Sequence, residues 1–360
     1  MRKIGIVAAV VFVASWMFSL LCMHAAGQAG WKMEEENQNV ISESVVYENN
    51  QKGSEEPAGW NGNSHSVDQG DGEAYSRRII LERYGVRTYL SVEDYLPGVM
   101  VCQTGPEMGM EALKCQAVIA RTYIYRQMGE REEIQEEELD LDYLGDDTAR
   151  AGNTLTVHQK EELAKRLEQC RQAVEATAGV VMKYEERYIL PLFHERSAGR
   201  TRTGEADYPY LQSVESRWDV EDGGAEIRTA DGDATGVSEV SFSLSEFAQR
   251  IKNLSDAPSL DPERLSSEIQ IVKRDDAGYV LQIKIGPRIY TGDDVQYALD
   301  LPSTCFTIDT RTSGKIKVTV KGCGHGYGLS QNGAQAMAEE GWSYSDILNY
   351  YYKNISLVTE

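Results

Sequence analysis

Three stretches of the sequence concentrate side chains that can donate, accept or transfer protons. The first holds Gln103, Glu107 and Glu111, the second begins at His194, and the third centres on His325. Histidine and carboxylic acids are the usual groups of general acid–base catalysis, whereas a glutamine amide hydrogen-bonds but does not titrate. The chain therefore carries residue types suited to proton transfer on a polar substrate.

The second stretch has the composition of a ligand-binding loop. A lone histidine after a strand is usually structural, but Ser197, Gly199 and Thr201 follow His194 closely. Hydroxyl groups and a glycine behind a histidine favour a site loop, since the hydroxyls donate and accept hydrogen bonds. Glu195, next to the histidine, is a candidate acid.

In the third stretch, glycines alternate with other residues around His325, and Ser330 and Gln331 follow. The alternation superficially suggests a phosphate cradle, but no Gly-Lys-Ser/Thr follows and no strand–helix–strand unit surrounds it. Alternating glycines after a strand let the backbone approach another group closely. A tight strand-to-helix connection is the alternative to a binding loop.

A helix is predicted over residues 110–128 and must position part of the first stretch. Apolar residues recur at helical spacing along it, and Gly129 ends it. Glu111 lies in the first turn of this helix, where a carboxylate interacts favourably with the helix dipole. This interaction fully explains the presence of Glu111 without a catalytic role. Lys114 and Arg121 are seven residues apart and share roughly one face. They either bind carboxylates or hydroxyls of a substrate, or pair with acids.

The other predicted elements mix strands and helices without strict alternation. A second helix is predicted over residues 156–178, with Thr156 as N-cap and Gly179 as C-cap, and residues 93–96 are predicted as a short turn. Residues 130–152 are predicted as a loop. Further strands are predicted within 79–90, 180–184, 188–193, 269–272, 279–285, 305–308 and 316–320, and further helices over 245–254, 330–340 and 343–352. This order predicts an α+β fold rather than a doubly wound sheet.

The first 75 residues differ from the rest of the chain. Residues 1–26 contain Met-Arg-Lys and then an apolar run from Ile4 to Cys22, which is long enough to cross a bilayer. Because basic residues precede the run, the rest of the chain is expected outside the cytoplasm. A cleaved signal peptide is the alternative. Residues 27–75 are predicted as a disordered acidic linker, and residues 76–360 as a single large domain.

The composition argues against nucleic acid as a partner and against a disulfide framework. The net charge of −21 repels polyanions and argues against nucleic acid. The six cysteines show neither a disulfide framework nor Cys-x-x-Cys. Cys305 and Cys323 could pair if their strands are neighbours, and small buried thiols are the alternative. Since His158 and Cys170 lack a convincing ligand spacing, no metal site is predicted, and no cofactor is expected.

The motifs together resemble the stage II sporulation protein D family. The first comprises Tyr95-Leu-Pro-Gly-Val99 and Glu111-Ala-Leu-Lys-Cys-Gln116-Ala-Val-Ile-Ala-Arg121-Thr-Tyr123. The second is His194-x-x-Ser197-x-Gly199-x-Thr201 with a tail ending at Asp219, and the third is Gly324 to Gln335. The resemblance runs from Arg77 onward. It implies glycan contacts for Lys114, Gln116, Arg121, His194, Ser197, Gly199, Thr201, His325, Ser330 and Gln331.

The catalytic glutamate of that family corresponds to Gln103, and both flanks of the motif align there without a gap. In a lytic transglycosylase, one carboxylic acid protonates the glycosidic oxygen, and the 6-hydroxyl of the sugar then closes onto the anomeric carbon. Three interpretations remain open. The groove persists without chemistry, another acid (Glu107, Glu111 or Glu195) substitutes, or the mechanism in this branch never depended on that residue.

The resemblance implies a role in engulfment during endospore formation, or in related remodelling of the cell wall. The expected protein is anchored in the cell membrane by one helix, with its domain outside the cytoplasm. It would act on peptidoglycan glycan strands beside a cell-wall amidase. A lytic transglycosylase, a non-catalytic glycan-binding scaffold and an amidase enhancer are the alternatives for its activity.

Overall fold

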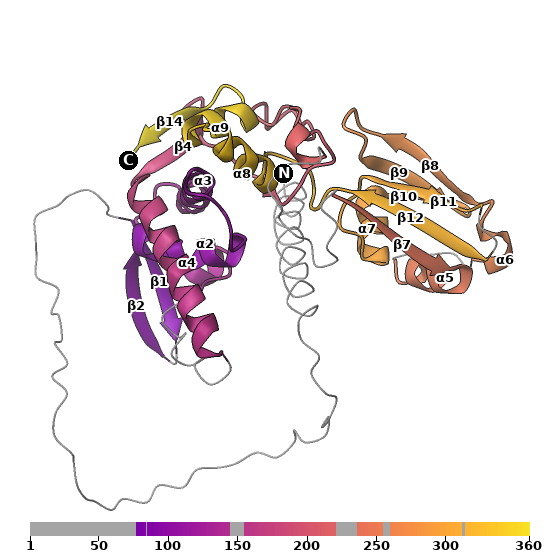
Figure 1. The fold of residues 1–360 in the computed structure, drawn as a ribbon, viewed down its shortest axis with the longest axis horizontal. Helices are drawn as coiled ribbons and strands as arrows, with labels where there is room; N and C mark the ends of the chain where they lie inside the picture. Colours follow the sequence, from indigo (N-terminus) through magenta and orange to yellow (C-terminus); the bar gives the residue numbers. More distant parts are fainter. Residues whose placement is uncertain (1–76, 84, 145–154, 221–235, 255–259, 312–313) are drawn as a thin grey trace, which may run out of the picture.

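The computed structural model describes residues 77–83, 85–144, 155–220, 236–254, 260–311 and 314–360. The predicted anchor over 1–26 and linker over 27–75 lie outside these ranges. Within them, no helix has the length and apolar character needed to cross a membrane. The fold is α+β, as the sequence predicts, and forms two lobes (Figure 1). The first lobe contains residues 77–220 and 322–360, and the second lobe contains residues 236–321.

Three helices form the centre of the first lobe. They are α2 (Val92–Gln103), α3 (Met110–Met128) and α4 (Val157–Glu175), and they pack against one another. The bounds of α3 are those predicted, and its apolar face is buried along its whole length. The hairpin of β1 (Arg78–Arg83) and β2 (Val86–Ser91) precedes α2, and β3 (Glu133–Gln135) pairs in parallel with β1.

Helix α2 replaces the short turn that was predicted over residues 93–96, so that prediction was wrong. The Ser91 hydroxyl caps the helix by accepting a hydrogen bond from the Asp94 amide at 3.0 Å. Pro97 lies inside the helix and Gly98 follows it, and both disfavour helix in isolation. The helix forms because its residues are buried, with Tyr95 at 0 % exposure. Tertiary packing therefore outweighs local propensity.

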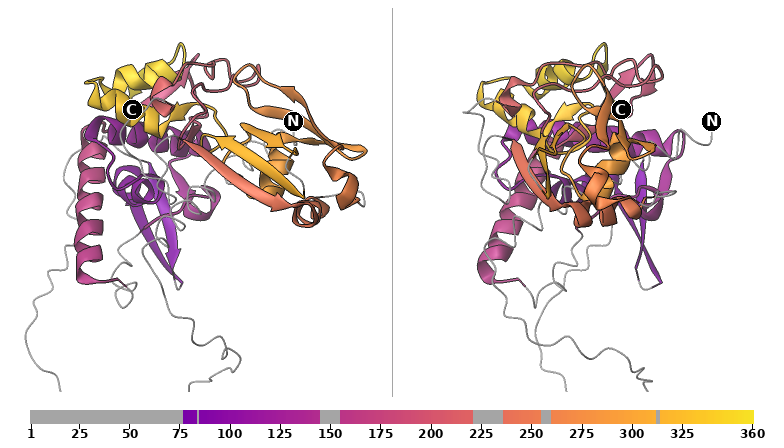
Figure 2. Two further views of the ribbon diagram at one scale, coloured as in Figure 1. Left: turned by 45° about the vertical axis from the view of Figure 1, so that its right-hand side comes forward. Right: turned by 90° about the vertical axis from the view of Figure 1, so that its right-hand side faces the viewer.

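Two small sheets and two helices complete the first lobe. Strand β4 (Val180–Tyr184) lies between β5 (Arg187–Tyr188) and β14 (Ser356–Thr359). Strand β6 (Phe193–His194) pairs in parallel with β13 (Leu329–Ser330), which leads directly into α8 (Gln331–Glu339) and then α9 (Tyr344–Tyr351). Helices α8 and α9 lie at the opposite end of the lobe from the tip of the β1–β2 hairpin (Figures 1 and 2).

The second lobe contains two three-stranded antiparallel sheets. One has the order β11-β12-β7, with β7 (Val237–Ser243), β11 (Phe306–Asp309) and β12 (Lys315–Lys321). The other has the order β10-β9-β8, with β8 (Ile269–Arg274), β9 (Val280–Ile285) and β10 (Arg288–Thr291). Helices α5 (Leu244–Lys252), α6 (Pro262–Leu265) and α7 (Gly292–Leu299) accompany them.

The apolar side chains fall into two separate buried clusters, one in each lobe. The larger cluster joins α2, α3 and α4 to α8 and α9. The smaller cluster lies between the strands and helices of the second lobe. The second lobe thus has its own core, although its chain is inserted between the second and third sequence stretches.

Candidate functional site

Three glutamines from distant parts of the chain meet at the end of α2. Gln116 Nε2 donates to Gln103 Oε1 at 2.8 Å, and Gln331 Nε2 donates to the backbone oxygen of Gln103 at 2.8 Å. Gln331 Nε2 also lies 3.3 Å from Gln116 Oε1. All three side chains are buried to more than nine-tenths. The first and third sequence stretches therefore converge in one amide network.

The network fixes which end of the Gln103 amide is free. Its Oε1 is held by Gln116, and no hydrogen-bond partner of its Nε2 occurs among the residues that the structure describes. A carboxylic acid in this position would keep one oxygen on Gln116 and present the other. Gln103 therefore offers an N–H donor where a glutamic acid would offer an exchangeable proton.

The three candidate acids occupy different surroundings. Glu107 is exposed. Glu111 accepts from Lys114 Nζ at 2.6 Å and from the Tyr344 amide at 2.7 Å, which ties α3 to the start of α9. Burial raises the pKa of Glu111, but these two hydrogen bonds outweigh burial and lower its pKa below the ordinary value. Glu111 is thus held as a fixed carboxylate, a poor state for a proton donor.

Glu195 lies beside the third stretch. Its Oε2 accepts a hydrogen bond from Cys323 Sγ at 3.1 Å, and its backbone oxygen accepts from the Asn332 amide at 2.9 Å. The residue is partly buried. Of the three candidate acids, Glu195 therefore lies beside His194 and the start of α8.

Lys114 and Arg121 of α3 pair with acids, which is one of the two alternatives for them. Arg121 is 0 % exposed, and its Nε and Nη2 each donate to a carboxylate oxygen of Glu93 at 2.7 Å. Its remaining donors reach Thr177 and backbone oxygens. The expected glycan contact of Arg121 is therefore corrected, because Nε, Nη1 and Nη2 of its buried guanidinium all donate within the protein. Lys114 forms an ion pair with Glu111 and stays partly accessible.

A buried aspartate joins the second and third stretches. Asp219 Oδ2 accepts from the amide and hydroxyl of Ser197 at 3.0 and 2.5 Å. Its Oδ1 accepts from Ser330 Oγ at 2.9 Å and from Asn332 Nδ2 at 3.0 Å. The hydroxyls of Ser197 and Ser330 are thus oriented by one carboxylate. The sequence placed Asp219 only at the end of a motif, and nothing local indicated that it also binds Ser330 and Asn332, which lie more than 100 residues away.

The two histidines lie side by side, with ring centroids 5.8 Å apart. His194 Nδ1 lies 3.1 Å from the Tyr327 carbonyl oxygen and must donate to it, so Nε2 carries the lone pair. That Nε2 is buried and lacks a hydrogen-bond partner among the described residues. Burial lowers the pKa of His194 to about 4, against an opposing effect of Asp219. His194 is therefore a neutral acceptor near pH 7.

His325 has the opposite tautomer. Its Nδ1 accepts from the Tyr327 amide at 3.0 Å, which leaves the proton on Nε2. Burial, followed by the neighbouring His194 and Arg202, lowers the pKa of His325 well below its ordinary value. The remaining N–H of His325 is engaged by the Phe193 backbone, so His194 supplies the unpartnered ring nitrogen of the pair, an acceptor suited to hydroxyl or amide donors.

The glycines around His325 allow the close approach that the sequence predicts. Gly324 has φ +100°, and a Cβ there would lie 2.7 Å from the Cβ of His194. Gly326 has φ +81°, and a Cβ there would lie 2.5 Å from the Tyr279 ring. Any side chain at these two positions would push the histidine loop away from its neighbours.

Gly199 and Thr201 have structural contacts. Gly199 has φ +97°, and its amide lies 3.2 Å from Ser197 Oγ. Thr201 is buried, and its hydroxyl accepts from the Val214 amide at 2.9 Å. These contacts hold the loop that carries Ser197, so both residues act on the site through its backbone.

The second lobe contacts the site through residues that the sequence analysis did not identify. Tyr279 is 0 % exposed, and its hydroxyl accepts from the Ala198 amide at 3.1 Å. Arg202 packs over the rings of Tyr279 and Tyr327, with its guanidinium carbon 5.0 and 4.5 Å from their centroids. Its Nε donates to Asp275 Oδ2 at 2.6 Å. Tyr279 therefore reaches between the two site loops.

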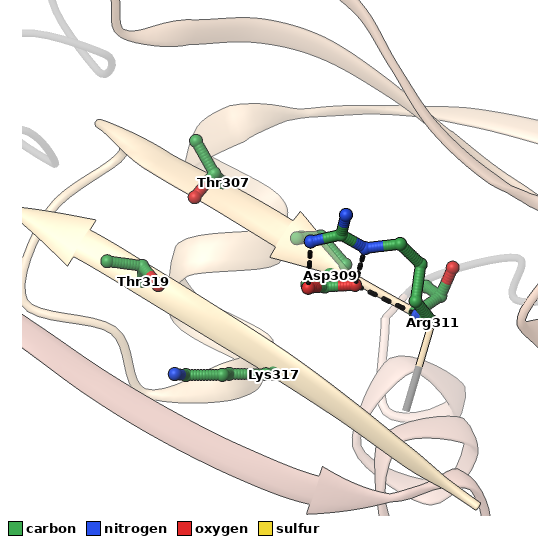
Figure 3. Close-up of a pocket in the computed structure, with 7 residues that line it drawn as sticks. Thr307, Asp309, Arg311, Lys317 and Thr319 are labelled. Carbon is green, nitrogen blue, oxygen red and sulfur yellow. Dashed lines mark hydrogen bonds and ion pairs between the residues drawn. The ribbon is translucent and has the colours of Figure 1, made fainter. Parts of the chain in front are cut away.

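The possible disulfide, a metal site and a pocket on the second lobe can each be compared with this chemistry. Cys305 and Cys323 are free thiols, so the possible disulfide is not formed. No group of three or more metal-ligating side chains occurs in the described ranges. A pocket of about 470 Å³ lies on β11 and β12 and is lined by Asp309, Arg311 and Lys317 (Figure 3). None of its lining residues belongs to the three stretches.

Comparisons with known proteins agree with the motifs. The family model described as "Stage II sporulation protein" matches residues 82–184. Stage II sporulation protein D of Bacillus amyloliquefaciens is 31% identical over 277 residues, which cover 74% of each chain. The protein of the same name from Bacillus subtilis is 31% identical over 282 residues, with 74% of each chain covered. The amidase enhancer of Bacillus subtilis is 26% identical over 307 residues, which cover 73% of this chain and 40% of that protein.

The identity to the two sporulation proteins extends well beyond the segment matched by the family model. The aligned region therefore includes residues of the second lobe or the third stretch, in addition to the helices of the first lobe. By its motifs, its fold and these relatives, the chain belongs to the stage II sporulation protein D family.

Proposed function

We propose that this protein binds glycan strands of peptidoglycan at an amide–histidine cluster, formed by Gln103, Gln116, Gln331, His194 and His325. The convergence of the three sequence stretches supports this function, because Gln331 bonds to Gln103 and Gln116 and directly follows Ser330, which pairs with His194. A sugar polymer offers hydroxyl and amide groups along its whole length. The family and its amidase-enhancer relative are consistent with a substrate in the cell wall.

The free Nε2 of Gln103 is the observation that carries this proposal. It can donate a hydrogen bond to a glycosidic oxygen but cannot transfer a proton to it. Loss of general acid catalysis typically costs about 10²–10⁴-fold in rate. The cluster is therefore better suited to holding a glycan strand than to cleaving it.

The other acids do not supply an evident replacement. Glu111 is fixed in hydrogen bonds to Lys114 and the start of α9. Glu107 is exposed, and Glu195 already accepts a hydrogen bond from the Cys323 thiol. Of these three, Glu195 is the acid to test first if cleavage is observed.

A second candidate function is enhancement of a cell-wall amidase, which the amidase-enhancer relative favours. In this function the protein would hold a strand while a separate amidase removes its stem peptides. It predicts faster amidase turnover on intact peptidoglycan in the presence of the protein, without glycan cleavage by the protein alone.

We further propose that residues 1–26 anchor the chain in the cell membrane and residues 27–75 lift the domain from its surface. The apolar run and the basic residues before it support this arrangement. Protease protection of membrane vesicles tests it: the lobes should be digested only from the outer side.

The direct test uses the full-length chain with peptide-free glycan strands. Binding is measured by co-sedimentation, and 1,6-anhydro ends are measured by mass spectrometry. We expect binding without anhydro products, and cleavage on introducing Gln103→Glu, because Gln116 would hold the new carboxylate as it holds the amide. Gln282→Glu, at an exposed position on β9, is the matched control and should yield no products.

The outcomes separate the alternatives. Anhydro products from the unchanged chain that vanish in Glu195→Gln would identify an enzyme with a relocated acid. Absence of glycan binding by the unchanged chain would refute the proposed function.

A further inference from the structure

Three aromatic side chains meet at the end of α8 that lies away from the amide–histidine cluster. Tyr350 contacts Trp218 and Trp342 edge to face, with ring centroids 5.9 Å apart in both pairs. Trp218 and Trp342 also meet edge to face at 6.4 Å. All three rings are partly exposed at the margin of the first core. We call Trp218, Trp342 and Tyr350 the aromatic cluster.

Hydrogen bonds at the polar ends fix the orientation of two of these rings. Trp218 Nε1 donates to Glu340 Oε1 at 2.7 Å, and the Tyr350 hydroxyl donates to the Glu215 backbone oxygen at 2.7 Å. Aromatic side chains held in this way lose little conformational entropy when a ligand binds them. The aromatic cluster is thus preorganised.

A lysine ammonium borders the aromatic cluster. The Lys353 ammonium lies 5.0 Å from the centroid of the Tyr350 ring. Among the described residues, no carboxylate forms an ion pair with it, although the chain has 57 acidic and 36 basic residues. Burial lowers the pKa of Lys353, in keeping with a position at the edge of the core. An unpaired, partly buried ammonium is complementary to an anionic ligand.

The aromatic cluster is linked to the amide–histidine cluster through Asn332 and helix α8. Trp218 immediately precedes Asp219, and its backbone oxygen accepts from Asn332 Nδ2 at 3.2 Å. Helix α8 begins at Gln331, spans 9 residues and leads into the loop of Trp342. Its length is about 13 Å at 1.5 Å per residue. A polymer of several sugar rings is long enough to reach from one cluster to the other.

We infer that the aromatic cluster and Lys353 form a second saccharide site, which takes a carboxylate-bearing pyranose ring of the strand held at the amide–histidine cluster. The C–H face of a pyranose is apolar and slightly positive, so it packs on the negative face of an aromatic ring. The carboxylate pairs with the ammonium of Lys353. This inference rests on the proposed function and extends it to a second point of attachment.

The test compares two ligands bound by the full-length chain in detergent. Peptide-free glycan strands carry a carboxylate on alternate sugars, and chitin oligosaccharides share the pyranose backbone without it. We expect Trp342→Ala to weaken binding of both ligands about fivefold, since ring stacking contributes roughly 1 kcal/mol. Lys353→Gln should weaken binding of glycan strands alone, and increasingly so at low salt.

Matched controls come from the second lobe. Tyr297 is an aromatic residue with 87 % exposure, and Lys252 is an exposed lysine, so Tyr297→Ala and Lys252→Gln should bind both ligands like the unchanged chain. If Trp342→Ala lowers the melting temperature, Trp342→Leu keeps apolar packing without a ring and should show the same loss of binding.

Two results would overturn the inference, and they are distinguishable. Unchanged binding in Trp342→Leu and Lys353→Gln, with binding by the unchanged chain intact, would refute the second site alone. No glycan binding by the unchanged chain would refute the proposed function and the second site together.

Discussion

At the scale of single residues, the site is a network in which each polar group is placed by another. Gln116 illustrates this best, because it donates to Gln103 and accepts from Gln331 inside the lobe. The network tolerates an amide or a carboxylate at position 103 with similar geometry. The same contacts therefore fit either a catalytic or a binding protein, and the titration behaviour of one side chain decides between them.

Gln116→Leu should destabilise the folded chain by about 1–3 kcal/mol, since it leaves Gln103 Oε1 buried without a donor. Urea unfolding monitored by tryptophan fluorescence measures the change. Gln172→Leu, at an exposed position on α4, provides the control and should stay within about 0.5 kcal/mol. A Gln116 variant as stable as the control would contradict the role given to the network.

The buried His194 makes stability depend on pH. Its folded-state pKa of about 4 lies below the ordinary value of 6.5. Between these values the unfolded chain binds a proton that the folded chain does not, so stability falls as pH is lowered through this window. His194 should contribute a loss on the order of 2 kcal/mol between pH 7.5 and pH 5.

Chemical unfolding at several pH values measures this loss. His194→Gln should reduce the pH dependence of the free energy of unfolding. Part of this dependence should remain, because His325 makes its own contribution to it. The exposed His158 on α4 is the matched control, and His158→Gln should keep the full slope. Identical slopes in the His194 and His158 variants would count against the neutral, buried state of His194.

At the scale of elements, helix α3 could be predicted from the sequence and helix α2 could not. Helix α3 follows from its apolar periodicity, and its predicted bounds are those observed. Helix α2 was missed because Pro97 and Gly98 imitate a turn, while the packing that stabilises the helix comes from distant residues. Helix α7 was also missed, although Thr291 and Asp294 form a capping box that the sequence displays.

Some residues of the candidate site could likewise be identified from the sequence, and others could not. The motifs identified Gln103, His194 and His325, because each lies in a dense local pattern. Asp219 and Tyr279 were missed because their roles depend on partners such as Ser330 and Ala198, which are 111 and 81 residues away. No periodicity or spacing encodes such contacts, so they appear only once the fold is known.

Gly98→Ala tests the packing of α2. Helix propensity alone predicts stabilisation of about 1 kcal/mol. A Cβ at this position would lie 2.4 Å from the Tyr143 ring and 2.6 Å from the Leu144 carbonyl oxygen, so we expect destabilisation of about 1–3 kcal/mol instead. Gly105→Ala, with no atom within 4 Å of the added Cβ, is the control. Increased stability of Gly98→Ala in thermal unfolding would refute this account.

At the scale of the whole molecule, the second lobe is attached to the site rather than merely inserted beside it. Arg202 of the first lobe is nearly buried and pairs with Asp275 of the second, while Tyr279 contacts both site loops. The position of the histidine loop therefore depends on how firmly the two lobes are joined.

Asp275→Asn should weaken this junction by about 1–3 kcal/mol, because it replaces a charge-assisted hydrogen bond to Arg202. Hydrogen exchange of the amides in residues 322–328 should become faster, while exchange in α3 stays unchanged. Asp276→Asn, which changes the neighbouring carboxylate, is the control. Equal protection of the loop in both variants would show that the ion pair does not hold the lobes together.

The wide separation of contacting residues has a kinetic consequence. The hydrogen bond between Gln331 and Gln103 closes a span of 228 residues, whereas the β1–β2 hairpin and α3 form from local contacts. Long-range contacts form late, because the chain must lose conformational entropy before these contacts stabilise the fold. We therefore expect the cluster to assemble only after both lobes have largely folded, so that earlier folding intermediates lack the ordered amide network.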